Sequence, residues 1–252
     1  METTLNKPVT PRSAKDKLIV ALDFETAREA FTLFSALRDV VGMFKVGSQL
    51  FTAEGPGIVR DIVRTGGRVF LDLKFHDIPN TVAAAGVEAT RLGVTIFNVH
   101  ACGGIEMMRR TSAAVAETAD REGIARPLVI GVTVLTSADD STLEEGGFSA
   151  GTNDQINRMS RLAADSGLDG VVASPRDVEL VREAVSRRDF VIVTPGVRPV
   201  GVANDDQRRV MTPSAAVRAG ADYLVVGRAI LGAPDPAAAA LRIIEEMQKA
   251  AG

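Results

Sequence analysis

The chain alternates eight times between a short apolar segment rich in β-branched residues and a stretch with helical spacing. The apolar segments cover residues 17–24, 42–51, 69–78, 95–101, 128–137, 170–175, 190–199 and 223–230. The helical patterns lie at about 26–39, 57–65, 81–92, 104–121, 152–166, 176–186, 214–219 and from 236 onward. Strict strand–helix alternation predicts a parallel sheet with right-handed crossovers. Eight such units in 252 residues predict an α/β fold of the (β/α)8 TIM-barrel class.

An open, doubly wound sheet is the alternative architecture for such a pattern. Sheets of that kind usually carry a glycine-rich dinucleotide-binding turn after the first strand, and the ALDFET sequence at residues 21–26 is not one. No linker or low-complexity stretch divides the chain, which predicts a single domain. We expect residues 1–16 to form a flexible lead-in and residues 17–252 to form the barrel.

The composition argues against some classes of binding partner and favours one cellular compartment. A net charge of -3 gives no reason to expect nucleic acid or an anionic membrane as a partner. No segment approaches the roughly 18 apolar residues of a membrane span, and the first residues lack the apolar core of a signal peptide. The single cysteine, Cys102, cannot form an internal disulfide. We therefore expect a cytoplasmic protein.

The segment from Val69 to Val82, VFLDLKFHDIPNTV, combines a strand with charged side chains. On an extended strand Asp72, Lys74 and His76 point to one face, while the apolar residues between them point to the other. An edge strand with one solvated face would show the same alternation. The flanking pattern instead predicts a parallel strand covered on both faces, so the charged face is expected to line a site.

Polar residues also lie near the ends of most other predicted strands. In barrels of this class the active site lies at the C-terminal ends of the strands, so these residues are expected to meet there. They are Asp23, Lys45, Asp72, Lys74, Asp77, His100, Thr136, Ser137, Arg198 and Arg228. Each alone would be read as an ordinary surface residue. Two long polar connections, 138–150 and 197–213, are expected to act as lids or binding loops.

Alternating lysines and aspartates hold one another in their charged forms. Lys74 would then remain an ammonium and act as a general acid, whereas a Schiff-base lysine needs a lowered pKa. Two carboxylates next to a substrate carboxylate disfavour the bound ground state. That repulsion disappears if the substrate carboxylate leaves as CO2, and the ammonium stabilises the carbanion left behind. The pattern therefore favours decarboxylation.

A second group of residues predicts a phosphate site. Barrels of this class commonly bind phosphate with the loops that follow strands seven and eight. Here those loops read Pro195-Gly196-Val197-Arg198 and Val226-Gly227-Arg228. Glycine permits close approach of the backbone, and arginine supplies paired donors.

These motifs closely resemble those of the orotidine 5'-phosphate decarboxylases. The resemblance covers nearly the whole chain, through ALDF, KVG, DLKFHDIPNTV, NVHA, VTVLTS, TPGVRP, DDQRR and VVGRAI. Its most specific part is the D-x-K-x-x-D spacing with the following I-P-x-T. The resemblance implies conversion of orotidine 5'-phosphate to UMP and CO2, the last step of de novo pyrimidine nucleotide synthesis. It implies no cofactor and no metal, and a homodimer with shared active sites.

The resemblance also implies a role for each site residue. Lys74 would donate the proton to C6 of the pyrimidine, within a charged array formed with Lys45, Asp72 and Asp77. Other positions would bind the substrate: the ribose through Asp23 and Lys45, the pyrimidine through Thr136 and Ser137, and the phosphate through Arg198, Gln207, Gly227 and Arg228. The partner subunit would contribute Asp77, Ile78 and Thr81, and residues 198–211 would form the closing loop.

Four alternatives differ in chemistry. The related 3-keto-L-gulonate 6-phosphate decarboxylases share the D-x-K-x-x-D strand but use magnesium and an enediolate; the HDIPNT run and the DDQ loop favour the orotidine enzyme. A Schiff-base aldolase conflicts with the carboxylates beside Lys74. A metal hydrolase would want more histidines than His76 and His100, and we expect His76 to be a packed or hydrogen-bonding residue. A barrel that only binds nucleotide would have no use for four alternating charges.

Overall fold

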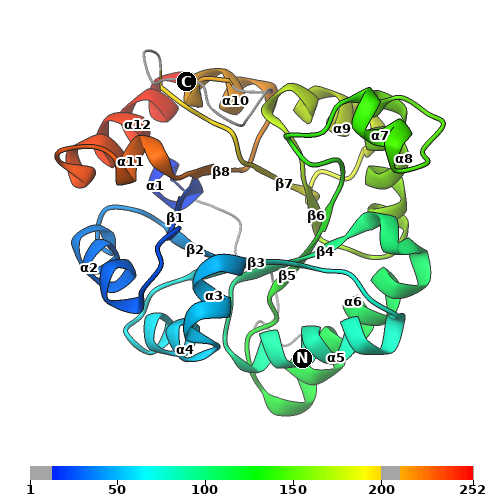
Figure 1. Ribbon diagram of the computed structural model, residues 1–252, viewed down its shortest axis with the longest axis horizontal. Coiled ribbons are helices and arrows are strands. Elements are labelled where there is room, and N and C mark those ends of the chain that lie inside the picture. Colours follow the sequence, from blue (N-terminus) through cyan, green and yellow to red (C-terminus); the bar gives the residue numbers. More distant parts are fainter. Residues whose placement is uncertain (1–12, 200–210, 252) are drawn as a thin grey trace.

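The computed structural model describes residues 13–199 and 211–251 and confirms the predicted (β/α)8 barrel (Figure 1). Eight parallel strands close in chain order, so that β1 pairs with both β2 and β8. The strands are β1 Leu18–Ala21, β2 Met43–Gly47, β3 Val69–Phe75, β4 Ile96–His100, β5 Leu128–Val132, β6 Gly170–Val172, β7 Val191–Thr194 and β8 Tyr223–Val226.

Helices surround the strands in a ring (Figure 1). They are α1 Ala14–Lys17, α2 Ala27–Leu37, α3 Ser48–Glu54, α4 Gly57–Arg64, α5 Pro79–Arg91, α6 Gly104–Glu122, α7 Asp140–Glu145, α8 Thr152–Asp165, α9 Val178–Ala184, α10 Pro213–Ala219, α11 Arg228–Leu231 and α12 Pro236–Ala251. Short 3-10 turns, Ala101–Gly103 and Pro175–Asp177, precede α6 and α9. No helix in the described ranges is both long enough and apolar enough to cross a membrane.

The strands separate two apolar layers. On β1, Leu18 and Val20 pack outward against the helices, whereas Ile19 and Ala21 point into the barrel. This alternation follows from the two-residue period of a strand. The inward layer fills the barrel below the C-terminal ends of the strands, and it contains Ile19, Ala21, Met43, Phe70, Ile96, Leu128, Ile130, Val191, Val193, Tyr223 and Val225.

The strands end earlier than the apolar runs suggested, most clearly β2, β5, β7 and β8. Residues 48–51 belong to α3 rather than to the second strand, residues 133–137 lie beyond β5, and residues 228–230 belong to α11. A short apolar run does not distinguish a strand from the buried face of a helix, because both need the same side chains. Leu50, for example, is buried as part of α3.

Two other segments contain helices that the sequence pattern did not predict. Helix α7 lies inside the polar 138–150 connection, with the Asp139 side chain as its N-cap. Residues 13–16, assigned to the lead-in, contribute to α1 and its capping box, in which the Ser13 side chain accepts from the Asp16 amide and Asp16 accepts from the Ser13 amide. Residues 1–12 lie outside the described part of the chain.

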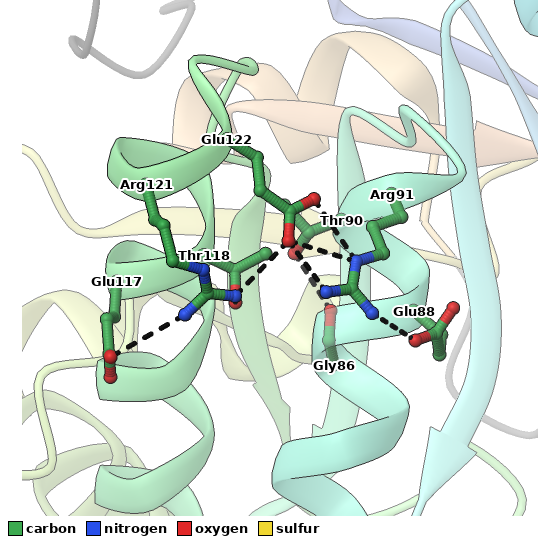
Figure 2. A network of polar contacts seen from close by, with 8 residues as sticks. All are labelled: Gly86, Glu88, Thr90, Arg91, Glu117, Thr118, Arg121 and Glu122. Carbon is green, nitrogen blue, oxygen red and sulfur yellow. Dashed lines mark hydrogen bonds and ion pairs between the residues drawn. The ribbon is translucent and has the colours of Figure 1, made fainter.

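Helix α5, which follows β3, is held against α6 by close packing and by surface charges (Figure 2). Gly86 permits the approach, because a Cβ there would lie 3.1 Å from a Thr111 methyl group. Arg91 Nη2 contacts Glu122 Oε1 at 2.6 Å across the two helices, and Arg91 Nη1 contacts Glu88 Oε1 at 2.6 Å. Hydrogen bonding to Arg91 lowers the pKa of the Glu122 carboxyl to about 2. These contacts position the helix that begins just after the predicted catalytic strand.

Candidate active site

A pocket of about 540 Å³ opens at the C-terminal ends of the strands. Its floor consists of Ala21, Phe70 and Val225, which belong to the apolar layer inside the barrel. Most of the polar residues that the sequence assigned to the site line this pocket, namely Asp23, Lys45, Asp72, Lys74, Thr136, Arg198, Gly227 and Arg228. Parallel strands bring these residues together because all eight end on the same side of the barrel.

Four of these side chains form a continuous chain of opposite charges. Lys45 Nζ lies 2.8 Å from Asp23 Oδ1 and 3.7 Å from Asp72 Oδ2. Lys74 Nζ lies 2.6 Å from Asp72 Oδ1. Asp72 is therefore bracketed by two ammonium groups, one from β2 and one from β3.

The environment of Asp72 keeps it ionised. Burial by itself would raise the pKa of this carboxyl group, because it disfavours the charged form. The charges of Lys45 and Lys74, with hydrogen bonds from Lys74 and Asn98, outweigh burial and lower the pKa below its ordinary value. The site thus keeps a buried negative charge between two positive ones.

Strand β3 is irregular where it carries these charges. Leu71 pairs with Phe97 and Phe75 pairs with Val99, so three residues of β3 lie opposite the single residue Asn98 of β4. Such a bulge re-aims side chains and leaves backbone groups out of the ladder. Lys74 has a φ of 51°, and it is the one non-glycine residue with positive φ among those described. Left-handed backbone is uncommon for lysine and is typical of functional sites.

Asn98 is a site residue that was not assigned from the sequence. Its side chain is fully buried. Its Oδ1 accepts from the Lys74 backbone N–H at 2.8 Å, and its Nδ2 donates to Asp72 Oδ1 at 2.7 Å. A clue was present: an asparagine inside an apolar strand sequence, Ile96–His100, needs buried partners. Which partners it has depends on the bulge in β3, and the bulge has no sequence signature.

One side of the pocket suits an anion. Pro195, Gly196 and Arg198 line it from the loop after β7, facing Gly227 and Arg228 after β8. Gly196 has a φ of +78°, a conformation that favours glycine. The Arg198 amide donates to the Met211 carbonyl at 3.0 Å, which joins the two ends of the predicted closing loop. Gln207 lies outside the described residues.

The part of the pocket near β5 is apolar. Val132 ends β5, Val134 and Leu135 follow it, and all three line the pocket beside Thr136. These residues belong to the VTVLTS motif, but only Thr136 and Ser137 were assigned to the site from the sequence. Ser137 is not among the residues that line the pocket in the described part of the chain.

Residues after β3 lie outside this pocket. Asp77, Ile78 and Thr81 are exposed on the rim, and the Ile78 side chain is 66% exposed. His76 does not share the pocket face with Asp72 and Lys74, because β3 ends at Phe75.

His76 packs instead against His100, with ring centroids 5.5 Å apart. Burial, with the charges of His76 and Lys74, lowers the pKa of His100. His76 is nevertheless exposed, so it contacts one ring and is not packed in the core as expected.

The chain is similar to proteins of one family along almost its whole length. A sequence model of the family described as "Orotidine 5'-phosphate decarboxylase / HUMPS family" matches residues 16–243. The orotidine 5'-phosphate decarboxylase of Geobacter sulfurreducens is 54% identical over 241 residues, which cover 95% of this chain and 99% of that protein. The enzyme of the same name from Moorella thermoacetica is 53% identical over 236 residues, covering 93% of each chain. The crystal structure of orotidine 5'-phosphate decarboxylase from Lactobacillus acidophilus matches with a TM-score of 0.81 and 35% identity, covering 91% of this chain and 98% of that one.

A substitution at Gly47 tests whether close packing positions the charge array. A Cβ at Gly47 would lie 2.9 Å from Lys45 Nζ and 3.6 Å from Asp23 Oδ1. We expect Gly47→Ala to displace the Lys45 ammonium from Asp23 with little change in Tm, as seen in a crystal structure of the variant and a thermal melt. Gly57→Ala is the matched control, because a Cβ there meets nothing within 4 Å. An unmoved Lys45 in Gly47→Ala would contradict the prediction.

Proposed function

Since this chain belongs to the orotidine 5'-phosphate decarboxylase / HUMPS family, we propose that it converts orotidine 5'-phosphate to UMP and CO2 in pyrimidine synthesis. The relatives that carry this name match almost the full length of the chain at about half of its positions. The observation that supports the chemistry most directly is the placement of Asp72 between Lys45 and Lys74 in the pocket. A metabolic enzyme of nucleotide synthesis is also expected to act in the cytoplasm.

The proposed reaction uses the charge array in two stages. The substrate carboxylate on C6 lies close to Asp72, and repulsion between the two anions disfavours the bound ground state. The bond between C6 and the carboxylate carbon then breaks, CO2 leaves, and the electron pair remains on C6. The Lys74 ammonium stabilises this developing carbanion and transfers its proton to C6, which gives UMP. Lys74 regains a proton from solvent.

The remaining pocket residues are proposed to hold the substrate in place. Asp23 and Lys45 bind the ribose hydroxyls; the Asp23 side chain is about half exposed and reaches the pocket. Thr136 and Ser137 contact the pyrimidine ring. The phosphate binds to a set that comprises Arg198, Gln207, Arg228 and the Gly227 amide. Fixing a substrate at both its ends orients C6 toward Lys74, and such orientation lowers the entropic part of the barrier.

We also propose a homodimer in which each subunit completes the site of the other. Asp77, Ile78 and Thr81 lie on the rim rather than in the pocket of their own chain. Ile78 is 66% exposed, and its burial against a partner subunit would favour such a dimer. In this proposal Asp77 extends the charge array of the partner subunit.

Lys74→Ala tests the reaction. Loss of the proton donor should reduce CO2 release by at least about 10²–10⁴-fold, measured by the ultraviolet absorbance change as orotidine 5'-phosphate is consumed. Lys249→Ala removes an exposed lysine of α12 and should leave turnover unchanged. Wild-type turnover in Lys74→Ala would contradict the role of Lys74, and an inactive wild-type protein would contradict the proposed function.

Arg228→Ala tests the phosphate site. Removing one charge-assisted donor should lower kcat/KM for orotidine 5'-phosphate by about 10- to 100-fold. Activity on orotidine, which lacks the phosphate, should be the same in the variant and the wild type. If both substrates lose the same factor, Arg228 does not bind the phosphate.

A mixing experiment tests the shared active site. Lys74→Ala and Asp77→Ala homodimers should each be nearly inactive. After subunit exchange, half of the sites in a mixed dimer carry both substitutions and the other half carry neither, so activity should reappear. Two variants mixed without exchange provide the control. Absence of any recovery after demonstrated exchange would mean that Asp77 acts within its own subunit.

A further inference from the structure

We propose that Asn98 is a positioning residue of the decarboxylation, which sets the backbone of Lys74 and the carboxylate of Asp72 through one side chain. The kinetic test of this inference rests on the proposed function. The role of Asn98 itself is inferred from the geometry of β3 and β4. Asn98 contacts no substrate in this proposal. It acts by holding the two residues that do.

The bulge makes Asn98 necessary. Residues Asp72 to Lys74 lie opposite Asn98 alone, so the regular ladder between β3 and β4 is interrupted there. A buried backbone N–H without a partner costs free energy. The Asn98 side chain supplies the missing acceptor for the Lys74 N–H, at 2.8 Å. It thereby supports the left-handed conformation of Lys74, whose φ is 51°.

The same amide orients the carboxylate. Asn98 Nδ2 donates to Asp72 Oδ1 at 2.7 Å, the oxygen that also accepts from Lys74 Nζ at 2.6 Å. Donation from two sides restrains the rotation of the carboxylate and keeps its other oxygen turned toward Lys45. Asn98 is fully buried, so its own rotamer is restrained by packing.

A primary amide suits this position for a chemical reason. It offers an acceptor and a donor at the end of one short side chain and carries no charge. Aspartate would keep the acceptor, lose the donor and place a second carboxylate against Asp72. Leucine has a similar size and offers neither group.

The charged and titratable groups around Asp72 determine the expected pH dependence. They come from four neighbouring strands and the residues that follow them, and they are Asp23, Lys45, Lys74, His76 and His100. In Asn98→Asp two adjacent carboxylates would share a proton, which raises the pKa at which Asp72 becomes protonated. The reaction needs ionised Asp72, so on lowering the pH the variant loses activity at a higher pH than the wild type does. The acid limb of the kcat–pH profile therefore moves upward in pH.

Steady-state kinetics on the full-length protein test the inference. In Asn98→Leu we expect kcat to fall by about 10²-fold, because a small displacement of reacting groups has an effect of that size, while KM changes little. In Asn98→Asp we expect a lower kcat and the upward shift of the acid limb. Thr111→Val is the matched control: it removes another fully buried polar group, whose hydroxyl donates within α6 to the Met107 carbonyl, and should leave both parameters unchanged.

Hydrogen exchange gives a readout that does not depend on activity. The Lys74 amide should exchange faster in Asn98→Leu than in the wild type, while amides of β7 keep their protection, as measured by NMR. Unchanged kcat, an unshifted acid limb or unchanged Lys74 exchange in a folded variant would overturn the inference. If Asn98→Leu does not fold, the kcat and the acid limb of Asn98→Asp test the inference by themselves. A wild-type protein without decarboxylase activity would contradict the proposed function, whereas unaltered Lys74 exchange would contradict this inference alone.

Discussion

The site depends on keeping one carboxylate ionised in a largely buried position. Moving an unpaired charge out of water costs many kcal/mol, and Asp72 avoids this cost because Lys45 and Lys74 lie on either side of it. The backbone of Lys45 is held by the hydrogen-bonded register between β2 and β3, whereas Lys74 lies in the bulge of β3, where its N–H donates to the Asn98 side chain. The rigidity of the barrel is therefore what makes the charge array possible.

The apolar interior of the barrel also contributes to the site. Ala21, Phe70 and Val225 belong to the inner core and form the floor of the pocket at the same time. An apolar floor lowers the local dielectric response, so each charge at the pocket acts more strongly on a neighbouring group than it would in water. Stability and the proposed chemistry thus share the same side chains.

The two parts of residues 69–82 are held in place by different contacts. The strand part is fixed by neighbours on both sides, and its one irregularity, at Lys74, is supported by the buried Asn98 amide. The part after Phe75 lies on an exposed rim at the start of α5. That helix is positioned by its packing on α6 and by the Arg91–Glu122 contact. In the proposed dimer, the first part serves its own pocket and the second serves that of the partner subunit.

The sequence alone determined the eight-fold alternation, the barrel, the charged face of Asp72 and Lys74 and the arginines that line the pocket after β7 and β8, because these follow from local periodicity and from the rule that parallel strands end together. The ends of β2, β5 and β8, the place of His76 and the contribution of Asn98 were decided only by the tertiary structure. Each depends on how one strand lies against the next. A bulge that sets three residues against one leaves no mark in the sequence of either strand, although it determines where Lys74 points.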